Sequence, residues 1–177
     1  FFGIGGALCV LLYPMLKYRA LGDFVIAISY GVLPTLGTSM VVLGSVDFNA
    51  LFIALPVGMI TIAILHANNT RDMVTDAQAR ITTLAMKLGV EFSVKLHIFW
   101  LTAPFVAVIV CVLLGIFPVA SLASLIALAP ATAQCKQMSK CEYNNTGAIS
   151  DLDQKTAQLQ LMFSLLLFAS FGIDYCL

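Results

Sequence analysis

Charged residues are scarce in this 177-residue sequence: they make up 10% of the chain, whereas apolar residues make up 60%. A soluble globular domain carries about 25% charged and about 45–50% apolar residues. This shortage of charge excludes a soluble globular domain, because too little polar surface is left to face water. The nine basic and nine acidic residues cancel, so the chain also lacks the positive excess of proteins that bind nucleic acid. The composition predicts an integral membrane protein in contact with lipid.

Paired cysteines and the common short motifs of soluble enzymes are also absent. The five cysteines form no Cys-x-x-Cys pair, and we expect buried, unreactive thiols. Cys135 and Cys141 share one polar loop and would form a disulfide only in an oxidising compartment. The chain has no Walker motif, zinc-ligand spacing or Gly-x-Ser-x-Gly motif. None of these motifs therefore competes with the acidic loop at residues 66–89 as the centre of activity.

Long apolar runs are what the sequence does contain. A membrane-spanning helix needs about 20 predominantly apolar residues, within a range of roughly 17–25. Six apolar blocks occur, at residues 1–12, 24–43, 50–66, 94–116, 119–133 and 159–177. The first block is short, so we expect it to be the end of a longer helix in a longer protein. The pattern predicts an all-α, polytopic transmembrane helical bundle with about six spans.

The connections between these blocks alternate between long and short. The long, polar connections are residues 13–23, 67–93 and 134–158, and the short ones are 44–49 and 117–118. All the basic residues lie in the long connections, except Lys95 at the border of one. The positive-inside rule then places the long connections in the cytoplasm or the mitochondrial matrix. We expect a bacterial plasma membrane or a mitochondrial inner membrane, and the spans hold too few ionisable groups to favour a transporter.

The long connection at residues 66–89 contains a regular set of oxygen ligands. If the preceding helix continues into it, Asn68, Asp72 and Asp76 recur every four residues on one face. Two carboxylates and an amide suit Mg²⁺, which takes one or two protein carboxylates and completes its shell with water and substrate phosphates. Nearby arginines would neutralise phosphate charge. The spacing predicts a magnesium–diphosphate site, and a solvated helix end with two ordinary acids is the alternative.

Three segments of the sequence resemble the UbiA superfamily of intramembrane prenyltransferases. Residues 68–76, Asn-Asn-Thr-Arg-Asp-Met-Val-Thr-Asp, resemble its second aspartate-rich motif. Residues 13–23 resemble its Tyr-x-x-x-Lys segment, with Tyr13 and Lys17 in the two named positions. Residues 154–159 resemble the approach to the last helix. The likeness is closest to the menaquinone branch, which includes MenA and the animal UbiA-domain-containing prenyltransferases.

This resemblance implies a fold and a reaction. Family members have nine helices around a central cavity, where two aspartate-rich motifs face each other and Mg²⁺ ions bridge them to an isoprenyl diphosphate. Ionisation of the diphosphate gives an allylic cation, which an aromatic acceptor captures. Residues 1–177 would then be helices four to nine, a partial prenyltransferase domain. The N-terminal part with the first motif, Asn-Asp-x-x-Asp-x-x-x-Asp, is absent from this sequence.

The resemblance also assigns roles to individual residues. The implied magnesium ligands are Asn68, Asp72 and Asp76. The implied diphosphate-binding residues are Lys17, Asn68, Asn69, Arg71 and Arg80. The implied catalytic residues are Lys17, Tyr13 and Arg71.

Two positions within the second motif depart from the family pattern. The branch usually reads Asp-Arg-x-x-Gly, whereas here Ala77 replaces the arginine and Arg80 replaces the glycine. The first change removes a cation from the metal-binding face. The second places a long side chain where a close approach of the backbone is expected.

Two functions therefore compete. The first is Mg²⁺-dependent transfer of an isoprenyl group from a polyprenyl diphosphate to an aromatic quinone precursor, with membrane lipid as the surrounding medium. The second is a catalytically inactive UbiA-like subunit that packs against other membrane subunits in a larger assembly, such as a respiratory complex. A first aspartate-rich motif upstream of Phe1 would favour the enzyme.

Overall fold

The computed structural model describes residues 1–17, 21–143 and 145–176, without the side chains of Lys17, Tyr175 and Cys176. The first helices are α1 (Phe2–Lys17), α2 (Gly22–Ile26), η1 (Ala27–Val32), α3 (Leu33–Leu43), η2 (Phe48–Ala50) and α4 (Leu51–Arg71). The later ones are α5 (Met73–Gln78), α6 (Leu84–Leu88), α7 (Val90–Leu113), η3 (Val119–Ala127), α8 (Leu128–Met138), η4 (Thr146–Ile149) and α9 (Leu152–Cys176). Within the described ranges the chain forms helices and no β-strand.

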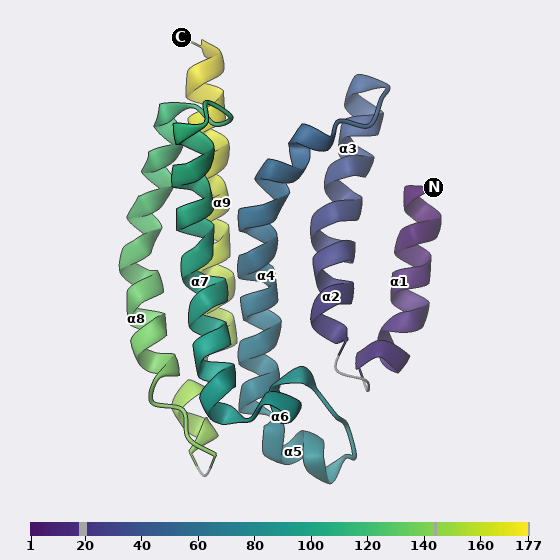
Figure 1. Ribbon diagram of the computed structural model, residues 1–177, viewed down its shortest axis with the longest axis vertical. Helices are drawn as coiled ribbons and strands as arrows, with labels where there is room; N and C mark the ends of the chain where they lie inside the picture. The colour runs from purple at the N-terminus through teal and green to yellow at the C-terminus, as the bar shows by residue number, and fades with distance from the viewer. Residues whose placement is uncertain (18–20, 144, 177) are drawn as a thin grey trace.

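Among the described residues, five helical segments are long and apolar enough to cross a membrane. They are Gly22–Leu43, Phe48–Arg71, Val90–Leu113, Val119–Met138 and Thr146–Asp174. The first apolar block forms a shorter helix, Phe2–Leu16. The long helices run side by side (Figure 1). The prediction of an all-α, polytopic bundle is therefore confirmed, and within the described residues the first block forms a shorter helix, as its length indicated.

The span Gly22–Leu43 changes its helical geometry halfway. It consists of α2, the π-helical turn η1 and α3, and Pro34 lies at the start of α3. Proline donates no hydrogen bond, and its ring crowds the carbonyl group four residues earlier, at Tyr30. The wider π-helical turn accommodates this crowding without breaking the span. The span ends at Gly44, whose φ of 71° is left-handed and whose N–H donates to the Met40 carbonyl at 3.1 Å.

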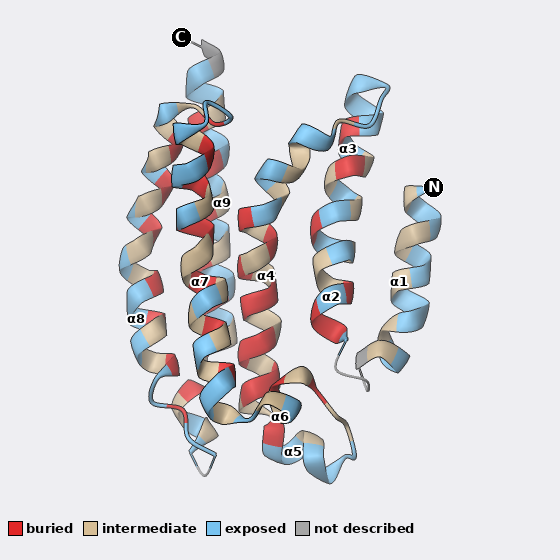
Figure 2. Cartoon of the chain, viewed as in Figure 1, coloured by how far each residue is buried: buried red, intermediate tan, exposed pale blue. Residues whose placement is uncertain are grey.

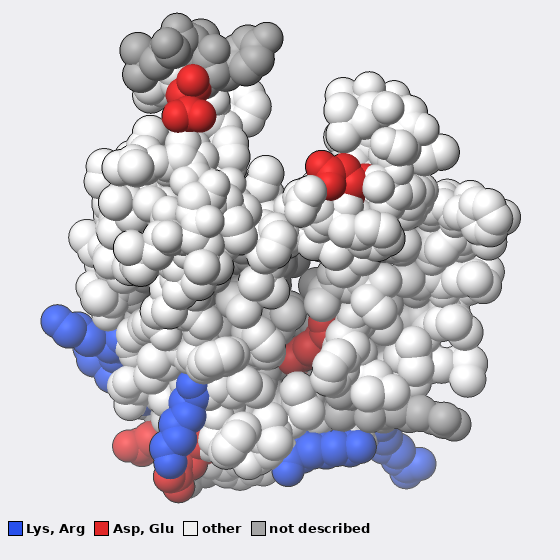
Figure 3. All heavy atoms as spheres, turned by 45° about the horizontal axis from the view of Figure 1, so that its top comes forward, with Lys and Arg blue, Asp and Glu red and all other residues white. Residues whose placement is uncertain are grey.

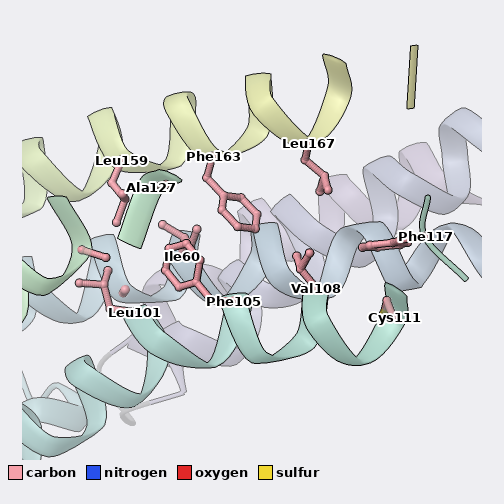
Figure 4. Close-up of a cluster of buried hydrophobic side chains, with 12 residues drawn as sticks. Ile60, Leu101, Phe105, Val108, Cys111, Phe117, Ala127, Leu159, Phe163 and Leu167 are labelled. Carbon is pink, nitrogen blue, oxygen red and sulfur yellow. The ribbon is translucent and has the colours of Figure 1, made fainter. Parts of the chain in front are cut away.

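The core lies between α4, α7, α9 and the η3–α8 segment. Ile60, Leu101, Phe105 and Phe163 are completely or almost completely buried within it, and their side chains point toward one another (Figure 4). The rings of Phe105 and Phe163 meet edge to face, with their centroids 5.5 Å apart. In contrast, α1 is largely exposed or half-buried (Figure 2). The tightly packed part of the bundle therefore begins at α4.

The described basic side chains all lie at one end of the bundle, together with most of the acidic ones. The basic side chains gather at the end where α4 meets α5 and α6 (Figure 3). They are Arg71, Arg80, Lys87, Lys95, Lys136, Lys140 and Lys155. Asp47, before η2, and Asp174, near the end of α9, lie at the opposite end. The predicted placement of the basic residues at one end is confirmed for these residues, and the side of the membrane that each end faces stays a prediction.

The cysteines are unpaired in the described part of the chain. Cys9, Cys111, Cys135 and Cys141 are free thiols, and Cys111 and Cys141 are buried. No disulfide therefore joins Cys135 to Cys141, the two thiols of the same polar segment.

Candidate functional site

The side chain of Arg71, the last residue of α4, donates hydrogen bonds to oxygen atoms of four other residues. Its Nε donates to Asp72 Oδ1 at 2.8 Å, and its Nη2 donates to Asp72 Oδ2 at 3.2 Å. Nη2 also donates to the side-chain oxygen of Asn68. Nη1 donates to Asp153 Oδ2 at 2.8 Å and to the Ser150 carbonyl oxygen at 3.2 Å. We call these five residues the Arg71 cluster.

The Arg71 cluster is open to ligands because its charged members are only partly buried. The side chains of Arg71, Asp72 and Asp153 keep 27%, 34% and 20% of their surface exposed. Charged groups at such a water-accessible border can exchange partners at moderate cost, whereas fully buried ions cannot. The cluster pairs one arginine with two carboxylates, so its net negative charge favours the binding of a cation.

Two of the three predicted magnesium ligands contact the same cation, the guanidinium of Arg71, and the third lies on another helix. Asn68 and Asp72 both accept hydrogen bonds from Arg71. However, α4 ends at Arg71, and Asp72 has φ −90° and ψ 9° at the junction with α5. Asp76 lies in the first turn of α5 and is half-buried. The expected continuous helix through all three residues is thus interrupted at Asp72, where the chain changes direction (Figure 1).

The oxygen atoms of the cluster fit Mg²⁺ better than a metal held by protein ligands alone. Within the described ranges, no three His, Cys, Asp or Glu side chains lie close enough together to hold a metal ion. Asn68 and Asp72, however, already direct their side-chain oxygens at one positive group, the Arg71 guanidinium. Mg²⁺ needs only one or two protein carboxylates, since water and substrate phosphates complete its shell.

Two further predicted diphosphate ligands occupy contrasting positions. Asn69 is 3% exposed, and its side-chain oxygen has no hydrogen-bond partner. Arg80 is exposed in the turn after α5, and its φ of 57° is left-handed. Glycine adopts this backbone conformation readily, whereas other residues are strained in it. The left-handed turn gives a physical reason for the glycine expected at this position.

Tyr13 and Lys17 come from the C-terminal end of α1. Tyr13 lines a cavity of about 540 Å³ between α1 and the α2–η1 segment, and Ser29 and Tyr30 line it from the other side. The side chain of Lys17 lies outside the described residues, so its role at the diphosphate stays a prediction.

A buried pair next to the predicted motif, Asp23 and His66, was not expected from the sequence. Asp23 Oδ2 lies 3.5 Å from His66 Nδ1, and the two side chains are 8% and 0% exposed. His66 Nε2 lies 3.2 Å from the Ser93 carbonyl oxygen. The pair therefore links α2, α4 and α7 close to Asn68. One signal in the sequence could have indicated a role for Asp23: it is the last residue of the segment 13–23, which also contains Tyr13 and Lys17.

A cavity of about 270 Å³ opens next to the Arg71 cluster. Its lining residues are Ile26, Tyr30, Thr61, Ile64, Leu65, Asn68 and Asp153. Asn68 and Asp153 form its polar end, and most of the remaining wall is apolar. Gln160 of α9 donates to Thr61 Oγ1 of α4 at 2.8 Å, which holds the two helices together at this cavity.

Residues 1–146 match the UbiA prenyltransferase family. The chain belongs to this family. The match includes Tyr13, Lys17 and the whole segment from Asn68 to Arg80, whereas Ser150 and Asp153 lie beyond it. The predicted family resemblance is therefore confirmed, and the structure adds two residues that the family match does not contain.

Known relatives are animal proteins of the same family. The chain is 37% identical over 157 residues to UbiA prenyltransferase domain-containing protein 1 of Gallus gallus, which covers 89% of this chain and 44% of that protein. It is 36% identical to the Homo sapiens protein of that name, with the same coverage. A Drosophila melanogaster homolog is 43% identical over 89 residues, 50% of this chain and 25% of that protein. The chain thus spans less than half the length of these relatives.

Proposed function

We propose that the whole protein is a Mg²⁺-dependent prenyltransferase that moves an isoprenyl group from a polyprenyl diphosphate to an aromatic quinone precursor. Family membership supports the prenyl-transfer chemistry. The observation that carries the proposal is the convergence of the Asn68 and Asp72 oxygens on one guanidinium at the membrane border. The aromatic acceptor and the quinone pathway rest on the resemblance to the menaquinone branch.

Each group in the site would have a separate task. Asn68, Asp72 and Asp76 would hold Mg²⁺, which supplies positive charge to stabilise the leaving diphosphate. Arg71 would add a donor fork that matches the phosphate oxygens. Tyr13 and Lys17 would reach the diphosphate from α1, and the cavity beside Thr61 would hold the first part of the hydrocarbon chain.

The position of the basic residues at one end supports one membrane orientation. The basic end, with the Arg71 cluster, would face the cytoplasm of a bacterium or the mitochondrial matrix, as the positive-inside rule predicts. The diphosphate would then approach from the aqueous side while the isoprenyl chain stays in lipid. An inactive subunit of a larger complex is the less supported alternative, because the oxygen ligands and the arginine are retained despite the changes at Ala77 and Arg80.

The decisive experiment uses the full-length protein in proteoliposomes with a polyprenyl diphosphate, an aromatic acceptor and Mg²⁺. We expect prenylated product from the unsubstituted protein and a loss of at least about 100-fold in the Asp72→Asn/Asp76→Asn double variant, because electrostatic stabilisation of the leaving group is a large contribution to such catalysis. Asp47→Asn, at the opposite end of the bundle, is the matched control and should retain full activity. Full turnover by the double variant would exclude this site.

A further inference from the structure

Arg71 has no hydrogen-bond donor left for a ligand. A guanidinium carries five N–H groups, and the Arg71 cluster supplies an acceptor for each of them. One is used by Nε toward Asp72, two by Nη2 toward Asp72 and Asn68, and two by Nη1 toward Asp153 and Ser150. Any phosphate that binds Arg71 must therefore replace some of these partners.

The five bonds divide into two sets according to the donating nitrogen and the part of the chain that accepts. Nε and Nη2 occupy the oxygens of Asn68 and Asp72, which are the two candidate metal ligands on α4 and its end. Nη1 is held by Asp153 and Ser150, at the start of α9 and just before it. Binding of a cation at Asn68 and Asp72 would require Arg71 to release the first set, whereas the second set can stay.

We propose that Asp153 is a positioning residue that keeps Arg71 in the site while the guanidinium exchanges Asn68 and Asp72 for the diphosphate. The inference rests on the proposed function, since it names how that site changes on binding. Asp153 holds the Nη1 edge with a charge-assisted hydrogen bond of 2.8 Å. The Nε and Nη2 groups then turn toward the phosphate oxygens, and the three side-chain oxygens of Asn68 and Asp72 become free for Mg²⁺.

Asp151, two residues before Asp153, is an acid with different contacts and serves as the comparison for Asp153. It lies at the same end of α9, but it pairs with Lys155 at 2.9 Å and accepts from Gln137 at 2.7 Å. Asp151 therefore ties α9 to α8, whereas Asp153 ties α9 to Arg71. The two acids have the same charge and adjacent positions, so a difference between their variants reports the Arg71 contact.

The inference predicts opposite shifts in metal binding for two variants. In Asp153→Asn the guanidinium loses its charged anchor on α9 and settles more firmly on Asp72, so the half-saturating Mn²⁺ concentration should rise about fivefold, the factor for one hydrogen bond. In Arg71→Gln the oxygens of Asn68 and Asp72 are released, so the same concentration should fall by about the same factor. The double variant should behave like Arg71→Gln, because Asp153 acts only through Arg71.

The test is a titration of the full-length protein in detergent with Mn²⁺ alone, followed by the electron paramagnetic resonance signal of free Mn²⁺. Asp151→Asn is the control for a general loss of charge or packing at α9, and it should leave Mn²⁺ binding unchanged. Asp153→Glu should restore binding to within about twofold of the unsubstituted protein, since it keeps the charge. Thermal unfolding of each variant checks that it is folded.

Kinetics in proteoliposomes provide the second readout. Asp153→Asn should raise KM for the polyprenyl diphosphate about fivefold and change kcat less. If Asp153 only stabilised the packing of α9 against α4, the same substitution would lower only the unfolding temperature. Equal Mn²⁺ binding by Asp153→Asn and Asp151→Asn, or no Mn²⁺ binding by the unsubstituted protein, would overturn the inference. Opposite Mn²⁺ shifts in a protein without prenyl transfer would support it and contradict the proposed function instead.

Discussion

At the scale of single residues, Arg80 departs from the family pattern and has a strained backbone conformation. Arg80 has a left-handed φ of 57° in the turn after α5, and the resemblance leads us to expect glycine there. A residue with a side chain pays roughly 1–2 kcal/mol in this conformation. The exposed position indicates that Arg80 contributes little packing in return.

We therefore expect Arg80→Gly to raise the free energy of unfolding by roughly 0.5–1 kcal/mol, since relief of the strain exceeds the extra freedom of glycine in the unfolded chain. The measurement is the thermal unfolding of the full-length protein in detergent. Arg80→Ala removes the same charge without relieving the backbone and is the control. Equal stabilisation by both variants would show that charge, and not φ, is the cause.

At the scale of elements, the bundle depends on the face of α9 that packs on α4 and α7. Phe163 is fully buried there against Phe105, whereas Phe168, just over one turn further along α9, is 78% exposed. Association of helices in lipid rests on close packing, because lipid tails and apolar side chains are equally apolar. The buried ring should therefore matter far more than the exposed one.

Phe163→Ala should lower the free energy of unfolding by about 3 kcal/mol, because it leaves a cavity in the core. Phe168→Ala, the matched control on the same helix, should change it by less than about 0.5 kcal/mol. The comparison requires reversible unfolding in mixed micelles. Similar losses in both variants would contradict the packing of α9 against α4 and α7.

The junction between α4 and α5 shows why the sequence predicted the site only in part. Four-residue spacing correctly placed Asn68 and Asp72 together, because both lie within one helical turn. The same spacing did not predict the change of direction at Asp72, which depends on how α5 and α6 pack beside α4. Asp153 lies in the long polar connection at residues 134–158, and its contact with Arg71 spans about 80 positions, so no local pattern in the sequence predicts it.

At the scale of the whole molecule, the placement of the basic residues at one end predicts a single orientation in the membrane. Lys140 lies at the basic end and Asp47 at the opposite end. Single cysteines introduced as Lys140→Cys and Asp47→Cys, in a cysteine-free background, should react with a membrane-impermeant maleimide from opposite sides. Reaction of both from the same side would contradict the bundle's orientation.

The native Cys141 would be a poor reporter for this purpose. Its thiol is buried, and burial, followed by the nearby Glu142, raises its pKa above the usual value. Only the thiolate reacts with maleimides, so a raised pKa keeps Cys141 protonated and slow at neutral pH. Its reaction with maleimide should accelerate only as the pH rises above the pKa of an ordinary thiol. Rapid labelling of Cys141 at pH 7 would contradict its buried position.

The helical membrane bundle, the approximate number of spans and the placement of the basic residues at one end could be predicted from the sequence, because each depends on local composition. The Asp23–His66 pair could not, since it joins α2 to α4 across an apolar segment and involves two residues that are individually ordinary at a membrane border. The π-helical turn at η1 was also unexpected, although Pro34 gives its physical reason.

The central claim is that a polyprenyl diphosphate binds with its head at the Arg71 cluster and its chain in the cavity beside Thr61. The most direct measurement is photolabelling of the full-length protein by an isoprenyl diphosphate that carries a diazirine in its first isoprene unit, with mass spectrometry of the adducts. We predict Mg²⁺-dependent adducts on the α4 segment from Thr61 to Asn68 that disappear in the Asp72→Asn/Asp76→Asn variant. Adducts confined to the apolar cavity near Trp100, or unaffected by that double substitution, would contradict the claim.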